Sequence, residues 1–166
     1  MVTTPVWHVE QNTQVVNLIG KVTIRWAALD VLLADLIYID SQNYALAHDS
    51  VFGSRDAGIQ RIQRVERAIG SSRFTQEERT AIFEITKKLS SIIGMRNEII
   101  HSPLLPNFAI VGKRLQSDLV QVKRAGHQKF SISAVEKHLD GIATLLFDLE
   151  RTVDQLSNKY LPPPID

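Results

Sequence analysis

The chain has 166 residues, with 19 Lys and Arg against 18 Asp and Glu, so its formal net charge is +1. It contains no cysteine, which excludes disulfides, thiolate metal sites and cysteine nucleophiles. The near-zero net charge argues against a uniformly basic nucleic-acid-binding protein. The length and composition predict one globular domain over residues 1–166. Neither a membrane-spanning run nor a signal peptide is recognisable, so we expect a cytoplasmic protein without membrane contact.

Apolar residues recur with helical periodicity in four segments, residues 11–39, 55–69, 75–101 and 133–160. The third and fourth of these segments open with capping boxes, Thr75-Gln76-Glu77-Glu78 and Ser133-Ala134-Val135-Glu136. Residues 40–54 are rich in Ser, Asn, Asp and Gly, and we expect them to be irregular.

Short β-prone segments separated by turn residues occupy residues 107–132, and a proline-rich tail occupies residues 161–166. The predicted fold class is therefore all-α. We expect an up-and-down bundle of about four helices with a small β-hairpin insertion, or three short strands, before the last helix.

The first helix carries a second, narrower apolar stripe opposite its core face. The stripe follows the three-and-four spacing of a helix–helix seam and consists of Ile24, Ala27, Val31, Ala34 and Tyr38. A helix that is apolar on two sides is either central in its domain or shared with a partner subunit. We therefore expect a homodimer formed through this stripe or through the polar side of the helix predicted over residues 75–101, the side that carries Asn97 and His101.

Arg96 is the residue that does not fit its helix. At about 100° per residue, it falls in the middle of the apolar face of the third helix, among Ile85, Leu89, Ile92 and Ile99. Burying an unpaired guanidinium is costly. The structural interpretation is that Arg96 reaches solvent or pairs with Asp30 or Asp35 of the first helix.

A polar flank runs beside Arg96 on the same helix. Asn97 and His101 are four residues apart and therefore lie on one side of the helix. Arginine offers a planar set of donors for phosphate oxygens, and histidine can transfer a proton near neutral pH. Arg96, Asn97 and His101 thus form a candidate catalytic site for cleavage of a phosphodiester.

The segment Arg96-Asn97-Glu98-Ile99-Ile100-His101 resembles the R-x4–6-H motif of HEPN domains, which are helical bundles with this motif late in their third core helix. The motif covers residues 96–102, and the resemblance of architecture covers most of the chain. The β insertion and the proline-rich tail depart from the compact members of the family.

Catalytic HEPN domains are metal-independent endoribonucleases in which two motifs meet across a homodimer or pseudo-dimer cleft, and the resemblance implies the same activity for this chain. His101 would promote attack of the ribose 2′-OH, Arg96 would hold the phosphate, and Asn97 would orient the pair. Two alternatives stay open. One is a non-catalytic HEPN-like module that binds a nucleotide or a partner protein, as in toxin–antitoxin pairs, and the other is a helical interaction protein with an accidental motif.

Basic residues are concentrated in residues 55–73 and 107–129, whereas the last helix is acidic, so the near-zero net charge still permits a local cationic cleft. The candidate substrate-binding residues are Ser102, Lys113, Arg114, Lys123 and Arg124. The alternative for these residues is an ordinary solvated surface. The histidines are scattered and none pairs with a carboxylate at metal-ligand spacing, so we expect neither a metal nor another cofactor.

Overall fold

The computed structural model describes residues 13–53, 58–101, 104–111, 114–123, 126–130 and 132–162, and side chains in 13–53, 58–100 and 132–162. Within these ranges the chain forms five helices. They are α1 (Thr13–Ser41), α2 (Tyr44–Phe52), α3 (Gly58–Gly70), α4 (Gln76–His101) and α5 (Ile132–Tyr160). The prediction of a helical bundle is confirmed, whereas the expected number of about four helices is one too few.

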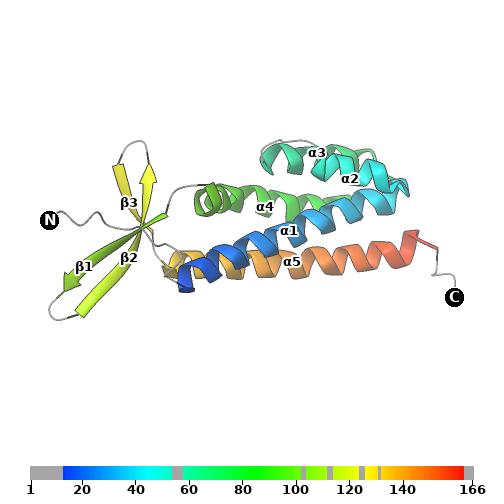
Figure 1. Cartoon of the computed structure of the whole chain (residues 1–166). Helices are drawn as coiled ribbons and strands as arrows, with labels where there is room; N and C mark the ends of the chain where they lie inside the picture. Colours follow the sequence, from blue (N-terminus) through cyan, green and yellow to red (C-terminus); the bar gives the residue numbers. More distant parts are fainter. Residues whose placement is uncertain are drawn as a thin grey trace.

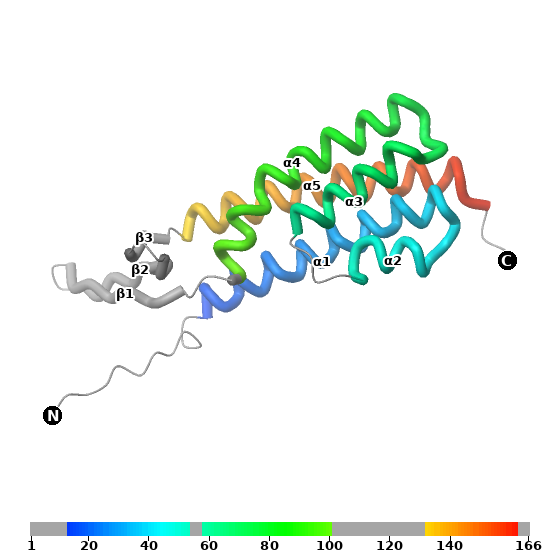
Figure 2. Tube along the Cα trace, turned by 90° about the horizontal axis from the view of Figure 1, so that it is seen from above, coloured from blue at the N-terminus to red at the C-terminus, as the bar shows by residue number. Residues whose placement is uncertain are grey.

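The two longest helices, α1 and α5, lie side by side and run in the same direction (Figure 1). The helix α4 runs in the opposite direction and contacts both of them, and α3 packs against α4 and α1 (Figure 2). The ends of α1 and α5 are tied together by Arg73, whose Nη2 donates hydrogen bonds to the carbonyl oxygens of Ile39 and Tyr160. One end of the bundle is therefore fixed by side chain to backbone contacts.

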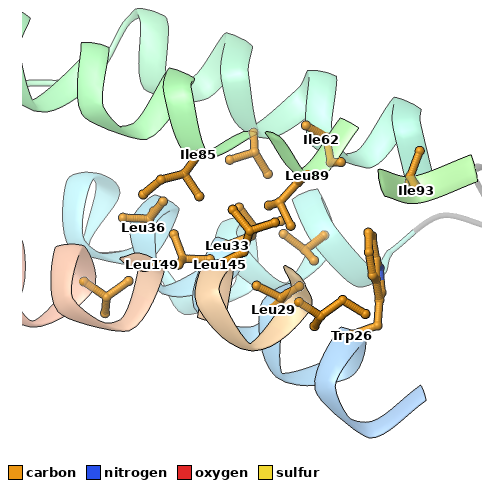
Figure 3. Close-up of a cluster of buried hydrophobic side chains, with 14 of the residues drawn as sticks. Trp26, Leu29, Leu33, Leu36, Ile62, Ile85, Leu89, Ile93, Leu145 and Leu149 are labelled. Atoms are coloured by element: carbon orange, nitrogen blue, oxygen red, sulfur yellow. The ribbon is translucent and has the colours of Figure 1, made fainter. Parts of the chain in front are cut away.

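The core fills the space between α1, α3, α4 and α5. Leu29, Leu33 and Leu36 of α1 meet Leu89 of α4 and Leu149 of α5, and all five side chains are buried (Figure 3). Their spacing by three and four residues is the one that keeps side chains on a single helix face. Trp26 closes one end of this cluster and lies next to the candidate site (Figure 3).

The expectation that residues 40–54 are irregular is wrong, because most of them form α2. Gln42 adopts a left-handed conformation (φ 52°) that ends α1. The Asn43 Oδ1 then accepts a hydrogen bond from the Leu46 amide (3.1 Å) and begins the new helix. Ala47 and Val51 are buried and hold α2 on the bundle. The polar residues that suggested turns are instead helix caps or lie on the exposed side of α2.

The capping box at the start of α4 is confirmed. The Thr75 amide donates to Glu78 Oε2 (2.8 Å), and the Glu78 amide donates to Thr75 Oγ1 (3.3 Å). Glu78 also accepts hydrogen bonds from Lys159 Nζ (2.7 Å) and the Tyr160 hydroxyl (2.8 Å) at the end of α5. Although partial burial opposes ionisation, these donors lower the pKa of Glu78 from 4.5 to about 2. One carboxylate therefore caps α4 and fastens the end of α5.

Replacing Glu78 by Gln should lower the free energy of unfolding at pH 7 by about 1 kcal/mol, the usual size of a lost cap. Because the folded state lowers the pKa of Glu78, its charged form stabilises the protein above pH 4.5, and this contribution is lost as the pH falls toward 2. Urea titrations of wild type and Glu78→Gln should therefore differ at pH 7 and converge near pH 2. The exposed Glu84→Gln is the control. A constant difference across this pH range would contradict the assignment.

Gly58 marks the place where α3 and α4 approach each other closely. A Cβ added at Gly58 would lie 2.5 Å from Ile93 Cδ1, so the absence of a side chain lets α3 begin directly against α4. Further along α3, Ile62, Val65 and Ile69 are buried at three- and four-residue spacing. The helix predicted over residues 55–69 is thus found, with bounds Gly58–Gly70.

Between α4 and α5 the chain forms the strands β1 (Leu104–Val111), β2 (Arg114–Lys123) and β3 (Gly126–Phe130). They make an antiparallel sheet in the order β1-β2-β3, with Leu104 opposite Gln121 and Leu119 opposite Phe130. The strands thus begin at Leu104, before the expected start of the insertion at residue 107. The next helix begins at Ile132, so Ser133 lies inside the first turn of α5 rather than before it.

The second apolar stripe of α1 is not central in the bundle. Ile24 is 71% exposed and Val31 is 50% exposed, and Ala27 is exposed as well, whereas Ala34 and Tyr38 are half-buried. Of the two interpretations of this stripe, the described residues therefore exclude an intrachain seam at Ile24 and Val31. None of the described helices combines the length and the apolar composition that a membrane-spanning segment needs.

Candidate functional site

Arg96 lies on α4 at the interface with α1 and α3 and is half-buried. Its Nη1 donates a hydrogen bond to the Asn97 Oδ1 (2.9 Å), and its guanidinium carbon is 5.8 Å from the centre of the Trp26 ring. An aromatic face at this distance attracts a guanidinium. The Asn97 side chain and the Trp26 ring thus hold Arg96 in a defined orientation.

A carboxylate from α1 faces the same arginine. Asp30 is buried, and its Oδ2 accepts a hydrogen bond from Arg61 Nη1 of α3. Burial raises the pKa of Asp30, while the positive charges of Arg61 and Arg96 oppose this rise. Burial likewise lowers the pKa of Arg96, and here Asp30 opposes the change while Arg61 adds to it. The charged side chains of Asp30, Arg61 and Arg96, one each from α1, α3 and α4, therefore lie together in a partly desolvated region.

The structural interpretation of Arg96 named Asp30 or Asp35 as its acidic partner, and the acid that interacts with it is Asp30. The pKa of Asp35 is raised by its own burial. Sequence reasoning missed two members of the cluster, Trp26 and Arg61. The Arg61 side chain is largely buried in the structure. In the sequence, however, Arg61 lies about 100° from Ile62, at the edge of the apolar face of α3, so no interrupted apolar stripe singles it out as one does for Arg96.

Asn97 is half-buried on the side of α4 next to Arg96. Its Oδ1 accepts the hydrogen bond of Arg96, which leaves its amide group as a donor toward a ligand. The helix continues to His101, its last residue, one turn beyond Asn97. The His101 side chain lies outside the described side chains, so its proposed chemistry rests on its place in the helix.

The candidate substrate-binding residues lie within residues 102–124, where the structure describes the strands β1 and β2 but no side chains. Ser102, Lys113 and Arg124 lie outside the described residues. Arg114 and Lys123 are the first and last residues of β2, and their side chains are not described. Their contribution to an RNA surface therefore stays a prediction.

Two further polar residues lie in the contact between α1 and α5. The Arg25 Nη1 of α1 donates a hydrogen bond to the Leu139 carbonyl oxygen of α5 (2.9 Å). His138 of α5 is buried, and its Nε2 has no hydrogen-bond partner among the described residues. Burial lowers the pKa of His138 and so favours the neutral ring.

Within the described part of the chain, no three His, Cys, Asp or Glu residues are grouped as metal ligands. Comparisons of the chain with protein-family models, with curated proteins and with solved structures found no match. The chemistry of the site must therefore be inferred from its own residues.

Proposed function

We propose that the protein is a HEPN-like, metal-independent endoribonuclease whose catalytic residues are Arg96, Asn97 and His101. The observation that carries the proposal is the state of Arg96. Its guanidinium is half-buried, lies against Trp26 and is oriented by Asn97, and Asn97 lies about one helical turn before His101. A preorganised guanidinium that does not have to be reoriented stabilises negative charge on a phosphate more than a mobile one.

In the proposed reaction, His101 accepts the proton of a ribose 2′-OH. The 2′-oxygen attacks the adjacent phosphorus and the bond from phosphorus to the 5′-oxygen breaks. Arg96 stabilises the charge that builds up on the phosphate oxygens. The leaving 5′-oxygen takes up a proton from water, and the protonated His101 returns its proton to the solvent. The products are a 2′,3′-cyclic phosphate and a 5′-hydroxyl, and no step requires a metal ion.

The active form is proposed to be a homodimer. The exposed part of the second stripe of α1, formed by Ile24, Ala27 and Val31, supports a helix–helix contact with another copy. The polar flank of α4 with Asn97 is the alternative interface. Two copies of the site in one cleft would supply two histidines and two arginines to one phosphate.

A second candidate function is a non-catalytic module that binds a nucleotide or a partner protein. The involvement of Arg96 with Asp30 and Arg61 favours this alternative, because an arginine that neutralises a buried carboxylate has a structural role without any ligand. Cleavage of RNA distinguishes the endoribonuclease from the non-catalytic module, whereas binding of a nucleotide or of RNA does not.

The deciding experiment incubates an end-labelled, unstructured oligouridine with the protein in EDTA. We expect cleavage that leaves 2′,3′-cyclic phosphate ends, and no cleavage of the matching oligodeoxyuridine, which lacks the attacking hydroxyl. Intact RNA, or cleavage that appears only after Mg²⁺ is added, would contradict the proposal.

A further inference from the structure

A hollow of about 750 Å³ lies between α3 and α4, outside the cluster around Asp30. Its lining residues are Gln63, Glu66 and Arg67 from α3 and Phe83, Lys87 and Ser90 from α4. A concave surface of this size accommodates a ligand of a few rings or part of a longer chain.

The lining of the hollow combines positive charge with an aromatic ring. Arg67 of α3 and Lys87 of α4 are exposed, and Phe83 of α4 is half-buried. Among the described lining residues, Glu66 is the one acid, and it accepts a hydrogen bond from the Oγ1 of the buried Thr86 (2.7 Å). The carboxylate is thereby drawn toward the helix interface. Cations beside an aromatic ring fit the phosphates and bases of a single-stranded nucleic acid.

The residues of α4 that line the hollow lie on the same stripe of the helix as Asn97 of the candidate site. Phe83, Lys87, Ser90, Gly94 and Asn97 follow one another at spacings of four, three, four and three residues, so they form one stripe of the helix. A Cβ added at Gly94 would meet nothing within 4 Å, so the surface between Ser90 and Asn97 is open. From Lys87 to Asn97 the stripe extends about 15 Å, which is enough for a few nucleotides.

We propose that the hollow is a second RNA-binding subsite, in which the strand that enters the candidate site continues along α4. Arg67 and Lys87 bind its phosphates and Phe83 contacts an unpaired base. This inference rests on the proposed function for the identity of the ligand, but the subsite itself can be tested by binding alone. The RNA contacts of this subsite lie on α3 and α4, outside residues 96–102. They add to the RNA contacts predicted for the β insertion.

The test compares two charge reversals on neighbouring residues of α4. Lys87 lines the hollow, whereas Lys88 is equally exposed but points about 100° away around the helix. Both variants change the net charge by the same amount, so long-range electrostatics affect them alike. The probe is a fluorescein-labelled oligouridine of ten nucleotides with 2′-O-methyl riboses, which cannot be cleaved, and the readout is fluorescence anisotropy in EDTA at several salt concentrations.

We expect Lys87→Glu to raise the Kd about tenfold and to reduce the salt dependence of binding by about one phosphate contact, with Lys88→Glu within about threefold of wild type. Equal effects of the two variants, or no binding of the probe by wild type, would overturn the subsite. If Lys87→Glu weakens binding selectively while wild type does not cleave RNA, the subsite stands and the proposed catalysis fails. If wild type cleaves but the two variants bind alike, the catalysis stands and the subsite fails.

Discussion

Replacing Arg96 by Met should lower the rate of RNA cleavage by about 10²- to 10³-fold, the usual loss when one donor to a transition-state oxyanion is removed. Methionine keeps an unbranched side chain against Trp26 but cannot bind phosphate. The free energy of unfolding should change by no more than about 1 kcal/mol, because Asp30 retains its hydrogen bond to Arg61. The measurement combines single-turnover cleavage of oligouridine with urea unfolding of the same preparation.

The matched control is Arg151→Met, which removes the same charge from an exposed position on α5. Cleavage by this variant should stay within about twofold of wild type, since a single exposed charge far from the site acts only through screened electrostatics. A purely structural role of Arg96 predicts the opposite pattern, with a large loss of stability and unchanged cleavage by the folded fraction.

Replacing Asp30 by Ala should destabilise the protein by about 3 kcal/mol, the lower end of the range for breaking a buried ion pair. The carboxylate is buried and faces two guanidiniums, and its removal leaves these charges facing each other without compensation. Chemical unfolding monitored by circular dichroism measures the loss. On the same helix, Asp35→Ala is the control and should change the free energy of unfolding by less than about 1 kcal/mol.

A double variant distinguishes uncompensated charge from simple loss of packing as the cause of the destabilisation. If the cost of Asp30→Ala comes from uncompensated charge, Asp30→Leu combined with Arg61→Leu should be more stable than Asp30→Leu alone. Additive destabilisation by the two substitutions would show that the charges at Asp30 and Arg61 are not coupled.

Periodicity and capping predict most of the bundle because they are local properties of the chain. The box formed by Thr75 and Glu78 begins α4 where the sequence places it, since both hydrogen bonds join residues three apart. The helix α2 was missed because its start depends on the left-handed conformation of Gln42 and its stability on burial of Ala47 and Val51 by other helices. The burial of these two residues is a consequence of tertiary structure, which a composition of turn-forming residues does not indicate.

The candidate site was predictable in part for the same reason. The anomaly of Arg96 is visible in one helix, because a charged residue interrupts an apolar stripe. Its partners belong to different helices, and only the packing of α1, α3 and α4 brings Trp26, Asp30 and Arg61 beside it. The hollow between α3 and α4 is likewise a product of two surfaces, so neither helix alone indicates it.

Arg96, Asn97 and His101 are proposed to form a metal-independent ribonuclease site. The most direct test of this proposal is single-turnover cleavage of oligouridine in EDTA by wild type, His101→Ala and the control His48→Ala, which alters an exposed histidine on α2. We expect His101→Ala to cleave about 10²- to 10⁴-fold more slowly than wild type, the range for loss of a general acid–base group, and His48→Ala to match wild type. Equal rates for wild type and His101→Ala would contradict the proposal.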